Sequence, residues 1–401
     1  MTATLSGTRI LVADDQPDVA RTFCSSLRTA GAKIQHVTDG RAAWDAIRSQ
    51  PFDLVLVDMK MPPEEWGGLW LLEQLAHSQA CIPVLVLSGE GGKPQVIKAM
   101  RLGAADWVDK DSAAEQLYPA CIKILTDASA VALQNAAEQL PTPLAHRFAR
   151  YLRATTTDTQ VSEGLHTIEA ILRFASCIGM AASQPRPIPG LAMSKLHRPS
   201  MGTWRDIAFA LGRQDETNTT AKRTVQALAP DTPTRTTVDA LVKLRNDVFH
   251  GRATPKNSDR DTIDWLLRCF AHRATTALRL GLTVATTMRF DGAAYTVDTL
   301  LVRGTAAPQP ATHHVGRPIV DGTILLVDES DSFPDLTPLF ASVTSPAGEV
   351  RCLQFDGILD RTDSDGHPVV KYASGDGRDG ELLDLPAAIT WPAAHQWMAS
   401  L

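Results

Sequence analysis

Five polar side chains stand at the ends of short apolar runs in the first third of the chain. Asp14 and Asp15 follow "RILVA", Asp58 follows "DLVLV", Ser88 ends "PVLVLS", and Lys110 ends "DWVDK". Three carboxylates in one place raise each other's pKa unless a hard divalent cation neutralises them, and a site with oxygen ligands alone selects Mg²⁺. A lysine and a hydroxyl opposite them would hold the oxygens of an incoming phosphoryl group. These residue types predict phosphoryl transfer to an aspartate nucleophile.

The surrounding elements must bring these side chains together. Five short apolar runs alternate with five segments of helical period, which predicts a parallel sheet covered by helices on both faces. The carboxyl ends of such strands share one edge, where the polar residues would meet. The expected strands lie in "RILVAD", "KIQHV", "DLVLVD", "PVLVLS" and "DWVDK", and the expected helices at 18–30, 40–49, 68–77, 93–102 and 112–126.

The motifs "LVADD", "LVLVDMKMP", "VLVLSG" and "GAADWVDK" resemble the receiver domain of two-component response regulators, with matching positions in order on five strands. The resemblance implies a flavodoxin-like, doubly wound five-stranded parallel sheet. It also implies that Asp58 is the phosphoacceptor and that Ser88 and Lys110 contact the phosphoryl group. Trp107 takes the position of the aromatic switch residue. Mg²⁺ would be held by Asp15, Asp58 and the backbone carbonyl of Lys60, and by Asp14 through water.

The same resemblance implies partners. A sensor histidine kinase or phosphotransfer protein would donate the phosphoryl group, and the receiver would pass this state to an output region. We expect phosphorylation to control two-fold association of the helical domains, which would make the protein a homodimer. Charged residues on the expected association face are Lys98, Arg101, Asp106, Asp109 and Glu115.

The sequence departs from the receiver pattern in two loops. The family usually places a proline after its lysine, across a cis peptide bond, whereas Lys110 precedes Asp111. We therefore expect a trans bond here and a slightly different course of the loop. The loop "KMPPEEWGGLW" after the third strand is longer than usual and carries Trp66 and Trp70. We interpret Trp66 as a half-buried packing residue or local lid, with a partner anchor as the alternative.

A second polar group lies in the middle of the chain, in "LVKLRNDVFHGRA". On a helix, Asn246 and His250 share a face, and the long stem of Arg245 could reach the same space. Gly251 is well placed to cap the helix. A histidine that titrates near neutrality beside a guanidinium suits cleavage of RNA by general acid and base without a metal.

"RNDVFH" followed by glycine resembles the R-x4-H motif of HEPN domains, which are helical bundles that often pair two-fold. Many of these are ribonucleases, which would make Arg245, Asn246 and His250 active residues, while others only bind or dimerise. The plain alternative is that Asn246 and His250 brace a helix end and that Arg245 forms a surface ion pair. The output is therefore open between a signalling adaptor and a HEPN-like ribonuclease.

A third output hypothesis is DNA binding, because residues 203–228 superficially resemble a helix-turn-helix. The segment between the two expected helices is too long for a tight turn. The would-be recognition helix offers only Lys222, Arg223 and Gln226. The net charge of −6, with scattered Lys and Arg, also argues against a duplex-binding surface.

The remaining features set the domain plan. We expect three domains: a receiver at 1–128, an all-helical bundle at 129–282 and a small antiparallel β domain at 283–401. The β domain is expected because short apolar runs alternate there with Gly, Asp and Pro. His313 and His314 are expected in a loop. The six cysteines lack disulfide or zinc spacing, and no signal peptide or membrane span is visible, so a cytoplasmic protein is expected.

Overall fold

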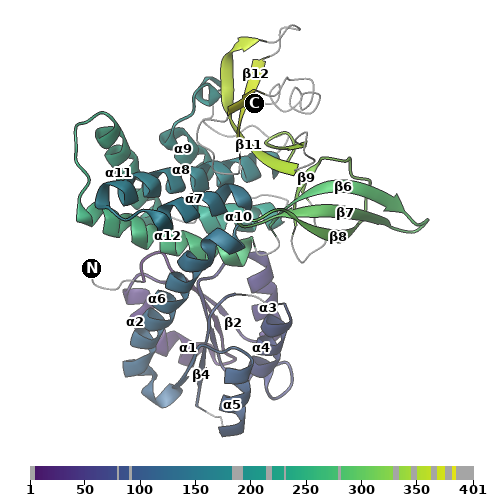
Figure 1. Ribbon diagram of the computed structural model, residues 1–401. Coiled ribbons are helices and arrows are strands. Elements are labelled where there is room, and N and C mark those ends of the chain that lie inside the picture. Colours follow the sequence, from purple (N-terminus) through teal and green to yellow (C-terminus); the bar gives the residue numbers. More distant parts are fainter. Residues whose placement is uncertain are drawn as a thin grey trace. The chain divides into compact units, whose positions relative to one another are not determined.

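The computed structural model describes residues 5–78, 81–89, 93–182, 193–213, 219–229, 232–278, 281–327, 334–344, 350–362, 368–374 and 382–384. The chain packs into two compact units (Figure 1). The first comprises 1–132 and 271–276, and the second 133–270 and 277–401. The three-domain boundaries expected from the sequence stay a prediction.

The first unit is built on a five-stranded parallel sheet with strand order β2-β1-β3-β4-β5, as the sequence predicts. Its three inner strands are mainly apolar because helices cover both faces of the sheet. The two edge strands carry more polar residues and are partly exposed. The five strands are β1 (Arg9–Ala13), β2 (Lys33–Val37), β3 (Leu54–Val57), β4 (Val84–Ser88) and β5 (Asp106–Asp109).

Alternate strand residues point to two separate cores. Leu11, Val55 and Val86 pack with one set of helices, whereas Ile10 and Leu56 face the other. In Figure 1 these two helical layers flank the sheet. The first layer contains α3 (Gly40–Ser49), α4 (Gly67–His77) and α5 (Lys93–Arg101), and the second contains α1 (Pro17–Phe23), α2 (Ser25–Thr29) and α6 (Ala113–Gln139).

Two helices differ from the prediction. The single helix expected at 18–30 is divided at Cys24, whose backbone angles of φ −81° and ψ −1° close α1 and open α2. The buried Cys24 side chain keeps both parts on the core, so the apolar period continues through the break. Helix α6 has 27 residues and runs past its expected end, because its apolar period does not stop at 126.

A short segment from much later in the chain completes the first unit. Residues 271–276, at the end of α12 (Asn257–Ala277), belong to it. Arg273 donates from Nε to Asp53 Oδ1 at 2.8 Å, and its Nη2 donates to the carbonyl oxygen of Gly7 at 3.1 Å. His272 Nε2 lies 2.9 Å from the carbonyl oxygen of Asp53. These contacts lie at the amino end of β3, the opposite end from Asp58.

The helical part of the second unit confirms the expected bundle region. Its core helix is α8 (Thr157–Ala182), on which α7, α9 and α10 pack. This is the one described helix long and apolar enough to cross a membrane by composition, and 72% of its apolar window is buried inside the protein. The other helices are α7 (Thr142–Arg153), α9 (Met201–Leu211), α10 (Thr219–Leu228), α11 (Thr232–Phe249) and most of α12, with the 3-10 turns η1 (Lys110–Ser112, in the first unit) and η2 (Met193–Leu196).

The strands of the second unit form two antiparallel sheets, ordered β8-β7-β6-β9 and β10-β11-β12-β13. The expected loop placement of His313 and His314 is wrong: both lie in β8, opposite Val297 and Thr296 of β7. The alternating exposure of β8 explains why its polar residues resemble a loop in the sequence. The strands are β6 (Leu282–Phe290), β7 (Tyr295–Val302), β8 (Gln309–Val315), β9 (Ile324–Leu326), β10 (Phe340–Thr344), β11 (Val350–Thr362), β12 (Pro368–Ser374) and β13 (Leu382–Asp384).

Candidate functional site

Three carboxylates meet at the carboxyl edge of the parallel sheet. Asp14 and Asp15 follow β1, and Asp58 follows the neighbouring strand β3. One oxygen from each lies within 4.8 Å of the others. Asp14 and Asp58 are 1% and 5% exposed, while Asp15 is open to solvent. The site offers only oxygen ligands and is partly open to solvent. Such a site fits a hard divalent cation that keeps some of its bound water.

The backbone holds these carboxylates in register. The Asp58 amide donates to the carbonyl oxygen of Ala13 at 2.8 Å, which continues the ladder between β1 and β3. Asp14 Oδ1 accepts from the amide of Gln16 at 2.8 Å. The His36 ring, at the end of β2, places Nε2 2.8 Å from the carbonyl oxygen of Asp14. His36 therefore contacts the backbone of a site residue, and the sequence motifs do not reveal this contact.

Lys110, the residue directly after β5, completes the site. Its Nζ lies 2.7 Å from Asp14 Oδ2 and 2.8 Å from Asp58 Oδ2, and its side chain is 15% exposed. Burial by itself lowers the pKa of the Lys110 ammonium. Hydrogen bonds and charges from Asp14 and Asp58 outweigh that effect, so the pKa lies above its ordinary value. Lys110 is thus held as a cation between two buried carboxylates, within reach of any group that joins Asp58.

The structure also locates three further residues that the sequence assigns to the site. Ser88 ends β4 and pairs in register with Asp109, but its side chain lies outside the described residues. Trp107 lies in β5, half-buried against the core beneath α3, α4 and α5. The Lys60 amide lies 3.4 Å from Asp58 Oδ1. The metal role of the Lys60 carbonyl and the switch role of Trp107 stay predictions.

The loop after β3 is tightly packed. Trp66 and Trp70 are half-buried against the same core, so Trp66 is a packing residue. A Cβ on Gly67 would lie 2.2 Å from the carbonyl oxygen of Pro62, and one on Gly68 would lie 2.3 Å from that of Asp58. Glycine is required at both positions because helix α4 begins against the backbone of the loop that follows Asp58.

Lys110 is joined to Asp111 by a trans peptide bond, as expected, since the cis bonds of the described chain are Pro62-Pro63 and Thr337-Pro338. The residues from Lys110 onward form the 3-10 turn η1.

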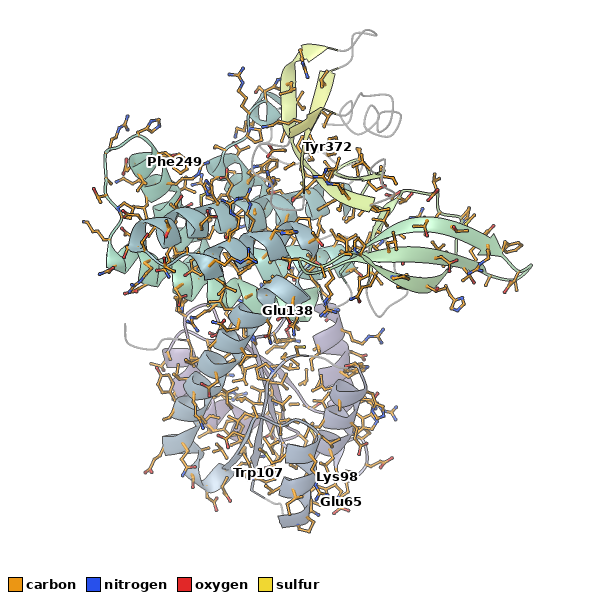
Figure 2. All side chains as sticks on the ribbon, in the orientation of Figure 1. Glu65, Lys98, Trp107, Glu138, Phe249 and Tyr372 are labelled. Carbon is orange, nitrogen blue, oxygen red and sulfur yellow. The ribbon has the colours of Figure 1, made fainter. Side chains whose placement is uncertain are left out.

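The polar side chains of the segment 241–253 point in different directions. Arg245 Nη2 donates to Glu169 Oε2 of α8 at 2.9 Å, and the guanidinium lies 4.9 Å from the ring centre of Phe249. Asn246 and His250 are exposed. Gly251, with φ 65°, caps the helix as expected. Arg245 therefore serves an ion pair inside the bundle, while Asn246 and His250 face solvent; their catalytic roles stay a prediction. Figure 2 shows Phe249 at the end of α11.

The proposed recognition helix of the helix-turn-helix is largely a core element. In α10, Ala221, Thr224, Val225 and Leu228 are each at most 1% exposed. The helix packs on α8, and the residues 214–218 before it lie outside the described part. A helix that buries this much of its surface in the bundle exposes little surface that could enter a DNA groove. The structure therefore agrees with the sequence-based argument against DNA binding.

The family comparison agrees with the geometry of the sheet. The model of the response regulator receiver domain matches residues 10–121, which include every residue of the acidic site and all of the parallel sheet except Arg9, the first residue of β1. Residues 10–121 are a response regulator receiver domain. The chain thus contains the receiving part of a two-component signalling protein.

Relatives share this part of the chain. Response regulator GtcR of Aneurinibacillus migulanus is 33% identical over 101 residues, 25% of this chain and 40% of GtcR. Transcriptional regulatory protein FixJ of Bradyrhizobium diazoefficiens is 29% identical over 156 residues, 39% of this chain and 72% of FixJ. The solved Francisella response regulator 1452 receiver domain is 25% identical, with 30% of this chain and 97% of that chain covered at a TM-score of 0.28. The family match ends before the R-x4-H segment begins.

Proposed function

We propose that this protein is a response regulator whose receiver accepts a phosphoryl group on Asp58 from a sensor histidine kinase or phosphotransfer protein in the cytoplasm. The observation that carries the proposal is the position of Asp58: a 5% exposed carboxylate with Lys110 Nζ at 2.8 Å and the Asp14 and Asp15 oxygens within 4.8 Å. Each of these groups has a defined use in phosphoryl transfer.

The chain's own residues supply nucleophile and charge. An Asp58 oxygen attacks the donor's phosphorus, an O–P bond forms, and the bond from phosphorus to the donor nitrogen breaks with the electron pair leaving on nitrogen. Lys110 is preorganised to hold one oxygen of the transferred group, because it already lies against Asp58. Ser88 would donate its hydroxyl to another. Asp14, Asp15, Asp58 and the Lys60 carbonyl would hold Mg²⁺, which neutralises negative charge on the carboxylates and the phosphoryl oxygens.

Mass spectrometry after incubation with a small phosphoramidate or acyl phosphate and Mg²⁺ tests this proposal. The intact protein should gain one phosphoryl group on the peptide that contains Asp58. Asp58→Asn should gain none, while Asp45→Asn, an exposed carboxylate on α3, should behave as the unchanged protein. Modification that persists in Asp58→Asn would place the acceptor elsewhere and overturn the proposal.

For the output we propose a signalling adaptor that works through dimerisation or binding of a protein partner. Helix α5 offers Ile97 and Met100, which are 50% and 45% exposed, as an apolar surface for association. Within the expected charged face, Lys98 pairs with Glu73 of the same chain at 2.8 Å. Figure 2 shows Lys98 and Trp107 at the same end of the first unit.

A further inference from the structure

The turn that follows β5 sets the direction in which Lys110 leaves the sheet. Strand β5 ends at Asp109, and η1 begins at the next residue. Asp109 has extended backbone angles, φ −70° and ψ 136°, and its Oδ1 accepts from the amide of Asp111 at 2.9 Å. The turn is closed at its other end by the amide of Ala113, which donates to the carbonyl oxygen of Lys110. Lys110 therefore sits inside a turn whose first hydrogen bond is made by a side chain.

Capping bonds of this kind decide whether a short turn forms. A single 3-10 turn has few backbone hydrogen bonds of its own, so an acceptor before its first residue contributes a large share of its stability. Loss of a side-chain cap destabilises the turn that it closes. Asparagine can replace aspartate in this role because its carbonyl oxygen accepts the same hydrogen bond.

Lys110 has little freedom once the turn is set. Its stem passes Gly89 closely enough that a Cβ on that glycine would lie 3.7 Å from Lys110 Cβ. Its ammonium reaches Asp14 and Asp58 at 2.7 and 2.8 Å. Both carboxylates are fixed by β1 and β3, so a shift of the turn changes the lysine and leaves the carboxylates in place. A misplacement of about 1 Å in a catalytic group can cost about 100-fold in rate.

We propose that Asp109 is a positioning residue: its side-chain acceptor caps η1 and thereby aims Lys110 at the phosphoryl-acceptor carboxylate. Asp109 touches neither Asp58 nor the incoming group, and it acts only through the turn. The negative charge of Asp109 is not required for this role. The inference rests on the proposed function for its kinetic consequence, but the capping itself is a property of the resting protein.

Kinetics of phosphorylation by a small phosphoramidate test the consequence. Asp109→Ala should lower the maximal rate about 10-fold, within the limit for a misplaced group, with an unchanged KM for the donor. Asp109→Asn should restore the rate, and Asp111→Ala, which keeps the amide donor, should match the unchanged protein. Because the effect passes through Lys110, the double variant Asp109→Ala with Lys110→Ala should be no slower than Lys110→Ala alone.

A second measurement does not depend on phosphorylation. Limited acylation with an amine-reactive ester, followed by peptide mass spectrometry, reports how accessible the Lys110 amine is. Lys110 should be labelled faster in Asp109→Ala than in the unchanged protein and in Asp109→Asn. Equal labelling of Lys110 in all three proteins, or an Asp109→Asn variant as impaired as Asp109→Ala, would overturn the positioning role. If the unchanged protein accepts no phosphoryl group, the proposed function fails, while the labelling experiment still decides the role of Asp109.

Discussion

Arg273 and Asp53 form a buried ion pair within the receiver unit although 220 residues separate them in the chain. Their side chains are 8% and 6% exposed. Asp53 also accepts from the amide of Arg9 at 2.8 Å, and Arg273 donates to Gly7. Removal of either side chain takes the opposite charge away from a buried ion, which is costly.

Asp53→Asn should therefore destabilise the protein by about 3–5 kcal/mol at neutral pH, the usual cost of breaking a buried pair by removing one partner. Arg273→Ala should cost a similar amount. Urea unfolding followed by circular dichroism measures both, with the exposed Asp45→Asn as the control. If neither variant loses more free energy of unfolding than the control, the segment 271–276 does not stabilise the receiver unit.

The same pair predicts a pH dependence. Burial by itself raises the pKa of Asp53, but the Arg273 guanidinium, with help from His272 and the Arg9 amide, outweighs it and holds the pKa below its ordinary value. A carboxyl group with a lowered pKa in the folded state stabilises fully above its unfolded value, about 3.9, and this contribution disappears as the pH falls through the folded pKa. The stability difference between the unchanged protein and Asp53→Asn should be constant above pH ~5 and shrink below pH ~4. A difference that stays constant down to the acid transition would contradict the prediction.

Gly68→Ala should disturb the acceptor site directly. The added methyl group would lie 2.3 Å from the carbonyl oxygen of Asp58 and 2.8 Å from Met59 Cα, and neither backbone atom can turn aside. We expect a loss of about 1–3 kcal/mol in the free energy of unfolding and slower phosphorylation of Asp58. Gly202→Ala in α9 is the control, because its Cβ would meet only ordinary contacts at 3.6 Å. Unchanged phosphorylation in Gly68→Ala would show that the loop after β3 can move without cost.

Arg245→Ala and His250→Ala separate an adaptor from a ribonuclease. If Arg245 is structural, its loss leaves Glu169 unpaired and costs about 1–3 kcal/mol, whereas the exposed His250 contributes within about 0.5 kcal/mol. An adaptor should not cleave single-stranded RNA in any of the three proteins. RNA cleavage by the intact protein that disappears in both variants would instead establish the acid–base site expected from the R-x4-H motif.

Association controlled by phosphorylation is tested by light scattering. With Mg²⁺ and beryllofluoride, which mimics the phosphoryl group, the mass in solution should rise from one chain to two. Asp58→Asn should stay at one chain. Ile97→Asp, on the exposed part of α5, should weaken the association without preventing phosphorylation. A mass that beryllofluoride leaves unchanged would falsify the dimer proposal.

The parallel sheet and its acidic site are predictable from the sequence because both depend on local patterns. Each strand is a short apolar run, and Asp14, Asp58 and Lys110 follow their strands directly. Parallel strands bring such ends together wherever the helices lie, so spacing alone places these three side chains in one site.

Contacts between a side chain and distant backbone cannot be predicted in this way. His36 contacts the carbonyl oxygen of Asp14, and His272 contacts that of Asp53; a carbonyl group is present at every residue, so no pair of residue types marks the contact. Arg245 shows the converse case. Its spacing to His250 fits a shared site, but Glu169, 76 residues earlier on α8, pairs with it instead.

The receiver unit is built from two separate chain segments, and this affects how the domain could be exchanged between proteins. A receiver cut out at the end of its family match, residue 121, would carry Asp53 without Arg273. Such a fragment, grafted onto another output, would lack the cation that pairs with Asp53. The transferable module of this protein is therefore discontinuous, and a graft that keeps the ion pair has to include residues 271–276 as well.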